Sequence, residues 1–230
     1  MTEAVAASAE AVGPQYSVDG MLQARAKTRE VIRHIAQKIE PGMVEEDAVV
    51  LATQTLLEAG LSQTWHPTRV RFGSNTTRAM KQRSEPGVIL KENDIFFIDM
   101  APRYLVWEGD RGESFVVGNN AEHARCAHDA KALFHEVRLK WDQEGLTGKQ
   151  LYEYADQRAR QMGWKLNFDL PGHRVSDFPH AAIYTGALAD ADFPPSPARW
   201  VLEIHIRHPE KPFGAFYEDL LLDDEFYQDA

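Results

Sequence analysis

The stretch IFFIDMAPRYLVWEGDRGESF, residues 95–115, contains two apolar segments that each lead to an acidic residue. Ile95–Ile98 runs directly into Asp99, and Leu105–Trp107 is followed shortly by Asp110. Short runs rich in isoleucine, valine and aromatic residues predict buried strands. We therefore expect a β-hairpin that turns midway between the two acids and places them directly opposite each other. Because like charges opposite each other destabilise a sheet, this pattern predicts a cation between the two carboxylates.

A second hairpin with two opposed acids is predicted near the C-terminus. Residues 200–222 read WVLEIHIRHPEKPFGAFYEDLLL, and a turn at HPEKPFG places Glu203 opposite Glu218. A single acid on a strand is most simply a solvated residue, but here two opposed pairs lie among apolar neighbours. Four buried carboxylates are very costly without cations. The sequence therefore predicts a dinuclear metal site, with two divalent ions about 3.5–4 Å apart.

Histidine is a frequent partner of carboxylates in such sites. The segment LPGHRVSDFPH, residues 170–180, offers His173 and His180. A lone histidine is more often a packing or surface residue. In the company of four converging acids, His173 becomes a candidate ligand.

The order of predicted elements occurs twice along the chain. Helical periodicity over 24–40 and 45–58 is followed by strand-like segments, and helices over 121–143 and 147–163 are followed by strand-like segments again. Two halves, about 20–120 and 121–230, related by a pseudo-two-fold axis are the natural interpretation. We expect one α+β domain over 20–230 with helices covering one side of the sheet, preceded by a flexible tail at 1–19.

Composition restricts the partners and the compartment. The net charge of −10 argues against nucleic acid and anionic membranes as partners. The single cysteine, Cys126, excludes an internal disulfide and is predicted to be a buried bystander in a helix rather than a catalytic thiol. No apolar run approaches the ~18 residues of a membrane span, and the first residues lack the features of a secretory signal. These features together predict a cytoplasmic protein.

The motifs in this order resemble the pita-bread metallohydrolases, the family of methionine aminopeptidase, Xaa-Pro aminopeptidase, proline dipeptidase and creatinase. The resemblance rests on LKENDIFFIDMAP, EGDRGESF, PGHRVSDFPH, WVLEIHI and AFYEDLLL, and it covers roughly residues 20 to 225. It implies a pita-bread fold and a site that binds two divalent ions, which are manganese, iron, cobalt or zinc. The implied metal ligands are Asp99, Asp110, His173, Glu203 and Glu218. By the same resemblance, Asp110 and Glu218 bridge the ions, Glu203 also acts as the catalytic acid/base, and the catalytic His180 donates a hydrogen bond to the substrate.

The chain departs from the family at the expected substrate site. Where the peptidases usually have a histidine after a Gly-x-Asn-like segment, FGSNTTRAMK places Met80 or Lys81. His66 is a candidate replacement in substrate binding, although a polar loop residue is an equal interpretation. Arg78 is a candidate for binding a substrate carboxylate, since arginine suits carboxylates, although a surface charge is the simpler interpretation. Gly112 stands where the family tends to have threonine.

Three functions are compatible with these residues. The leading hypothesis is a dinuclear metallohydrolase of the aminopeptidase type that cleaves a C–N bond of a short peptide or amino-acid derivative. The alternative is a non-peptidase enzyme of the same fold acting on a small amidine, guanidino or hydroxy-amino-acid compound by hydrolysis, elimination or metal-redox chemistry. A binding protein without catalysis is the third hypothesis, and the complete ligand set argues against it. A homodimer is compatible with the sequence.

Overall fold

The computed structural model describes residues 8–62, 64–79, 81–177, 179–180 and 184–227. Its core is an antiparallel sheet with the strand order β1-β2-β5-β9-β8-β6, and β7 pairs with β8 off this path. The bounds are β1 Arg69–Phe72, β2 Asp94–Met100, β5 Arg111–Val117, β6 Lys165–Leu166, β7 His173–Arg174, β8 Trp200–Arg207 and β9 Gly214–Leu220. Two further short strands, β3 (Arg103–Tyr104) and β4 (Trp107–Glu108), form a separate hairpin. The predicted mixed architecture of helices on an antiparallel sheet is confirmed.

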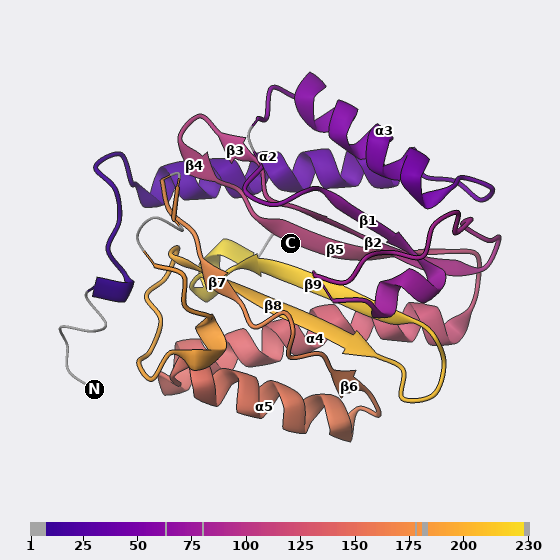
Figure 1. Cartoon of the computed structure of the whole chain (residues 1–230). Coiled ribbons are helices and arrows are strands. Elements are labelled where there is room, and N and C mark those ends of the chain that lie inside the picture. The colour runs from indigo at the N-terminus through magenta and orange to yellow at the C-terminus, as the bar shows by residue number, and fades with distance from the viewer. Residues whose placement is uncertain (1–7, 63, 80, 178, 181–183, 228–230) are drawn as a thin grey trace.

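Helices α2 and α3 lie beside the first half of the sheet, and α4 and α5 lie beside the second half (Figure 1). Their bounds are α2 Val18–Ala36, α3 Glu45–Glu58, α4 Ala121–Glu144 and α5 Gly148–Gln161. Short 3₁₀ helices in the described part of the chain include η1 Gly73–Thr77, η3 Leu188–Asp190 and η4 Asp224–Tyr227. Thr147 and Gln150 form the capping box that opens α5. The first helix begins earlier than the expected residue 24, because the Ser17 side chain accepts a hydrogen bond from Gly20 N and caps it there.

Strand alternation separates the apolar core from a polar face. On β2, Phe96 and Ile98 pack with Val31 and Ile32 of α2 in one buried cluster. On β8, Leu202, Ile204 and Ile206 pack with residues of α4 and α5 in another. Successive side chains on a strand point to opposite faces. Asp99 and Glu203 therefore lie on the face that the helices leave uncovered.

The predicted register of the two hairpins is correct in one case and wrong in the other. Glu203 is directly opposite Glu218 in the β8–β9 pair, as expected. In the β2–β5 pair, however, Asp99 is opposite Gly112, and Asp110 lies one residue before β5. The reason is the inserted β3–β4 hairpin, which turns at residues 105–106 with Leu105 at the left-handed φ of 55°. Asp110 therefore reaches Asp99 from a loop rather than from the facing strand.

The segment before α2 packs against the second half of the chain through Glu10 and Gly13. The buried carboxylate of Glu10 accepts hydrogen bonds of 2.7 Å from Ser196 N and from Trp200 Nε1. The carboxylate of Asp177 accepts a 2.7 Å hydrogen bond from Gly13 N. The described part of the expected tail at 1–19 is thus in contact with the domain. Among the described residues, no helix is both long and apolar enough to cross a membrane.

Candidate metal centre

Four carboxylates from four different places in the chain meet on the uncovered face of the sheet. Asp99 is on β2, Glu203 on β8 and Glu218 on β9, and Asp110 directly precedes β5. Their residues are buried, with exposed fractions of 2% for Asp99, 4% for Asp110, 4% for Glu203 and 1% for Glu218. The structure therefore brings together all four acids that the sequence predicted to converge.

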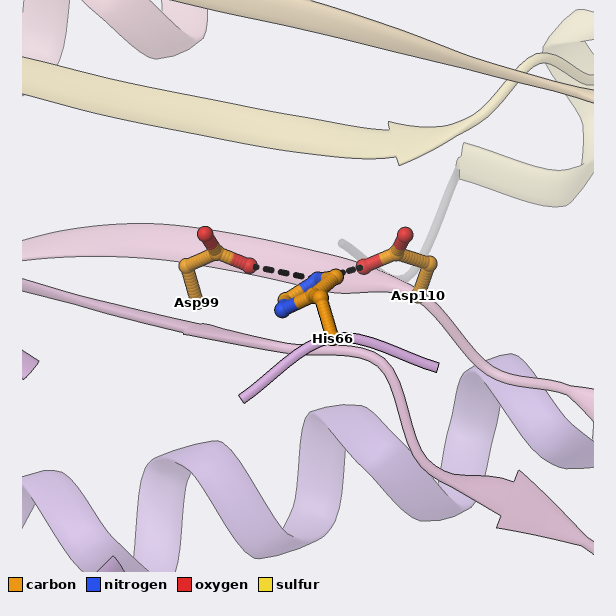
Figure 2. A group of neighbouring side chains, drawn as sticks. All are labelled: His66, Asp99 and Asp110. Atoms are coloured by element: carbon orange, nitrogen blue, oxygen red, sulfur yellow. Dashed lines mark ion pairs between the residues drawn. The ribbon is translucent and has the colours of Figure 1, made fainter. Parts of the chain in front are cut away.

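Two histidines contact this acidic cluster. His173 Nε2 lies 2.9 Å from Asp110 Oδ2. His66 Nε2 lies 3.4 Å from Asp99 Oδ1 and 3.6 Å from Asp110 Oδ1, and its ring projects between the two carboxylates (Figure 2). From its place in the sequence, His66 was expected to bind the substrate. The structure brings it to the carboxylates themselves, and it also lines the adjacent cavity described below.

The crowding of negative charge perturbs the carboxyl groups of the cluster. Burial, together with the charges of Asp110 and Glu203, raises the pKa of Asp99 to about 6. Burial and the neighbouring acids raise the pKa of Glu218 well above its usual value, and burial with Asp110 raises the pKa of Glu203. Burial would raise the pKa of Asp110, but its close contacts with His173 and His66 and the charges of these two imidazoles outweigh burial and hold that pKa below the usual range.

The neighbouring acids raise the pKa values of the two histidines. Burial alone would lower the pKa of His66, but Asp99 and Asp110 outweigh burial and raise that pKa to about 10. The contact with Asp110 likewise outweighs burial and raises the pKa of His173 to about 9. Both imidazoles therefore lie where positive charge is strongly favoured.

The cluster fits divalent metal ions. Four of its buried oxygens accept no hydrogen bond of good geometry from the described residues, namely Asp99 Oδ1, both oxygens of Asp110 and Glu218 Oε1. Unpaired buried acceptors of this kind are costly, and a metal ion satisfies them. Two groups of potential ligands share Asp110: one comprises His66, Asp99 and Asp110, and the other comprises Asp110, His173 and Glu218. Carboxylate and imidazole donors suit manganese, iron, cobalt and zinc.

A cavity of about 400 Å³ opens beside the cluster. Its walls include His66, His173, His180 and Glu203. Trp65 covers one side, and its ring makes edge contacts with the rings of His66, His173 and His180, with centroids 4.8, 4.7 and 4.9 Å apart. This volume lies within the range of small-molecule sites.

His180 is held in place by a carboxylate that the sequence analysis did not single out. His180 Nδ1 lies 2.8 Å from each carboxylate oxygen of Glu108, whose Oε2 also accepts a 2.9 Å hydrogen bond from Ser176 N. Glu108 is 3% exposed. It stands two residues before Asp110 in the EGD motif, and this position was the one available sequence signal. Trp65 was also missed, and it carried no signal beyond standing next to His66 in the sequence.

Arg78 and the Met80–Lys81 position were also expected near the substrate site, and among the described residues only Lys81 of these is found at the cavity. Arg78 forms an ion pair with Glu85 and donates to Asn75 Oδ1, and it is not among the described residues that line the 400 Å³ cavity. Lys81 does line that cavity, whereas Met80 lies outside the described residues. Lys81 thus supplies a positive charge in the region where the family resemblance led us to expect a histidine.

Comparisons with known proteins agree with this architecture. The model of metallopeptidase family M24 matches residues 19–221. Among solved structures, the X-Pro aminopeptidase from Thermotoga maritima MSB8 superposes with a TM-score of 0.74 at 18% identity, covering 97% of this chain and 63% of that chain. The prolidase from Pyrococcus horikoshii OT3 superposes with a TM-score of 0.71 at 15% identity, covering 95% of this chain and 62% of the prolidase. The methionine aminopeptidase from Thermotoga maritima superposes with a TM-score of 0.68 at 14% identity, covering 92% of this chain and 94% of the aminopeptidase.

These similarities confirm the expected pita-bread fold. The chain spans just over three fifths of the length of the X-Pro aminopeptidase and the prolidase, with 63% and 62% of those chains covered. No curated protein matches the sequence significantly.

Proposed function

Because the chain belongs to metallopeptidase family M24, we propose that it is a metal-dependent hydrolase of the aminopeptidase type. In this proposal it cleaves a peptide or amide C–N bond in a short peptide or amino-acid derivative. The observation that carries the proposal is the group of buried carboxylates on Asp99, Asp110 and Glu218, four of whose oxygens accept no hydrogen bond of good geometry from the described residues.

Two divalent ions are the proposed cofactor. Asp99, Asp110, His173, Glu203 and Glu218 are the residues that would hold these ions, and Asp110 and Glu218 would serve both of them. When bound, such a pair of ions lowers the pKa of a water molecule and polarises the scissile carbonyl. The donor set is compatible with manganese, iron, cobalt and zinc.

Glu203 is the proposed proton carrier. Gly172 N donates a 2.7 Å hydrogen bond to Glu203 Oε2, and the Tyr152 hydroxyl donates to Glu203 O at 3.1 Å. These contacts fix both the carboxylate and the backbone from which it projects. A carboxyl group held in this way can take a proton from the attacking water and return it to the leaving nitrogen.

His180 is the proposed contact to the substrate oxygen. Because Glu108 engages its Nδ1, Nε2 is the ring nitrogen available to a substrate in the cavity. Trp65 narrows the same cavity and helps to exclude water from the reacting groups.

The cavity supports a small substrate. Its volume of about 400 Å³ and its apolar walls, which include Trp65, Leu170 and Tyr184, suit one or two amino-acid residues. Lys81 favours a second candidate, because a cation at the expected histidine position alters the recognition site. That candidate is an enzyme of the same fold acting on a small non-peptide compound with an amidine, guanidino or hydroxy-amino-acid group.

The test is a substrate panel with metal-loaded protein. The panel contains dipeptides, tripeptides, amino-acid amides and small amidine or guanidino compounds, and release of an amine is measured. We expect turnover of at least one C–N substrate and its loss in Asp99→Ala, with unchanged circular dichroism as the control for folding. Full turnover by Asp99→Ala would refute the proposed metal chemistry, and turnover confined to non-peptides would select the second candidate.

A further inference from the structure

We propose that His66 is a direct metal ligand, so that the centre has one imidazole for each of its two ions. This inference rests on the proposed metal-dependent function and deepens it. His66 would join Asp99 and Asp110 around one ion, while His173 would join Asp110 and Glu218 around the other. The family resemblance implies five ligands with a single histidine, and this chain would have six with two.

The first argument is that His66 and His173 are arranged alike around Asp110. His66 Nε2 faces Asp110 Oδ1, and His173 Nε2 faces Asp110 Oδ2. The other ring nitrogen of each histidine lies against the carbonyl of the following residue, with His66 Nδ1 2.9 Å from Pro67 O and His173 Nδ1 2.7 Å from Arg174 O. The candidate ligand His173 therefore has a structural counterpart in His66.

The contact with Pro67 O fixes which ring nitrogen of His66 carries the hydrogen. A carbonyl oxygen only accepts hydrogen bonds, so Nδ1 of His66 carries the hydrogen that points to Pro67 O. In the neutral ring, Nε2 then presents a lone pair to Asp99 and Asp110. Metal-bound histidines typically show this arrangement, in which one nitrogen binds the ion and the other donates to a carbonyl or carboxylate.

The third argument is the spacing of the donor atoms. A lone pair that faces carboxylate oxygens is unfavourable unless a cation or a proton lies between them. Nitrogen and oxygen ligands lie about 2.0–2.2 Å from zinc-sized ions, so two ligands at tetrahedral angles are about 3.4 Å apart. The distances from His66 Nε2 to Asp99 Oδ1 and Asp110 Oδ1 are 3.4 and 3.6 Å. This spacing is wider than a direct charge-assisted hydrogen bond of about 2.7–2.9 Å and matches the separation of two ligands of one ion.

The surroundings hold His66 in this position. The residue is 9% exposed, and the ring of Trp65 packs edge-on against it with centroids 4.8 Å apart. Figure 2 shows the imidazole pointing between Asp99 and Asp110 from a segment separate from those that bear the two acids. His180, although it lines the same cavity, makes its short contact with Glu108, and within the described part of the chain no acid of the metal cluster lies within 4 Å of its ring nitrogens.

A second imidazole changes which metal the centre prefers. Imidazole suits zinc, iron, copper and nickel, whereas all-oxygen surroundings suit magnesium, calcium and manganese. We therefore expect the metal position that includes His66 to bind cobalt and zinc more tightly than manganese. Removing the imidazole should reduce that preference.

The experiment compares wild type, His66→Gln and the matched control His180→Gln. Each protein is stripped of metal and titrated with Co²⁺ by calorimetry, and X-ray absorption of the loaded protein counts the imidazoles per metal. For wild type we expect two ions per chain and, on average, one imidazole per ion. In His66→Gln we expect one ion to bind at least ~10–100-fold more weakly, with the imidazole signal reduced by half. His180→Gln should match wild type in both measurements.

The outcomes separate this inference from the proposed function. Two ions in wild type with half an imidazole per ion, or an unchanged second affinity in His66→Gln, would overturn the role of His66 and leave the proposed function standing. No metal uptake by wild type would overturn both. The imidazole count in wild type decides the question even if His66→Gln does not fold.

Discussion

The ion-paired Asp219 provides a strong test of how the two halves are joined. Its side chain is fully buried on β9, and its two oxygens accept hydrogen bonds of 2.7 and 2.8 Å from Arg25 of α2. Arg111 of β5 forms a further ion pair with Asp219 and is only 1% exposed. One carboxylate of the second half therefore forms ion pairs with two arginines of the first.

We expect Asp219→Ala to be severely destabilising, because it leaves two buried guanidinium groups without their shared partner. Breaking a buried ion pair by removing one partner costs about 3–5 kcal/mol. For a domain of 150–250 residues, each kcal/mol lowers Tm by about 2–4 °C, so Tm should fall by roughly 6–20 °C. Urea unfolding followed by circular dichroism, with metal at the same concentration throughout, measures the loss of unfolding free energy.

The matched control is an exposed ion pair on α4. Lys140 and Glu144 are 36% and 50% exposed, so Glu144→Ala should cost no more than about 0.5 kcal/mol. A loss of less than about 1 kcal/mol in Asp219→Ala, or equal losses in the two variants, would refute the argument that this buried network links the halves.

The same carboxylate predicts a pH dependence. Burial would raise the pKa of Asp219, but Arg111 and Arg25 outweigh burial and hold that pKa below the ordinary value of 3.8. A depressed pKa contributes stability that is present above 3.8 and is lost as the pH falls through the lower folded value. The difference in unfolding free energy between wild type and Asp219→Asn should therefore be constant from pH 5 to 7 and shrink below pH 4. A difference that grew on acidification would contradict this sign.

Three further predictions concern the site and the lone thiol. Gly112→Ala should weaken metal binding roughly tenfold or more in calorimetry, because a Cβ there would lie 2.4 Å from the Phe216 ring and 2.9 Å from Glu218 Oε1, which displaces that ligand. Unchanged affinity would contradict the close packing. Cys126 is fully buried and burial raises its pKa, so a thiol reagent should react with it only in denaturant, and rapid labelling of the native protein would contradict this. Glu108→Gln should leave metal content unchanged but lower kcat/KM about tenfold, since it frees the ring of His180; an unchanged kcat/KM would argue against that positioning role.

The second half of the site could be predicted from sequence because its hairpin is regular. The strands β8 and β9 pair without interruption, so alternation and the position of the turn were enough to place Glu203 opposite Glu218. Two acids opposite each other among apolar residues then indicated a shared cation. The complementary pair in the first half suggested the convergence of all four acids, which the structure confirms.

The first half was harder because its loop adopts a conformation that the residue types do not indicate. Leu105 takes a left-handed φ of 55°, which is uncommon for residues other than glycine, and the short β3–β4 hairpin shifts Asp110 out of the strand. The roles of His66 and Glu108 depend on contacts between segments distant in sequence, such as Glu108 with His180. Spacing within one segment carries no information about such contacts.

The proposed two-ion centre is tested most directly by the metal content of natively purified wild type and of Asp110→Ala, measured by elemental mass spectrometry. Asp110 belongs to both groups of potential ligands, so its loss should affect both ions. We expect about two transition-metal ions per wild-type chain and few or none in Asp110→Ala. No metal in the wild type, and no uptake when manganese, iron, cobalt or zinc is supplied, would contradict it.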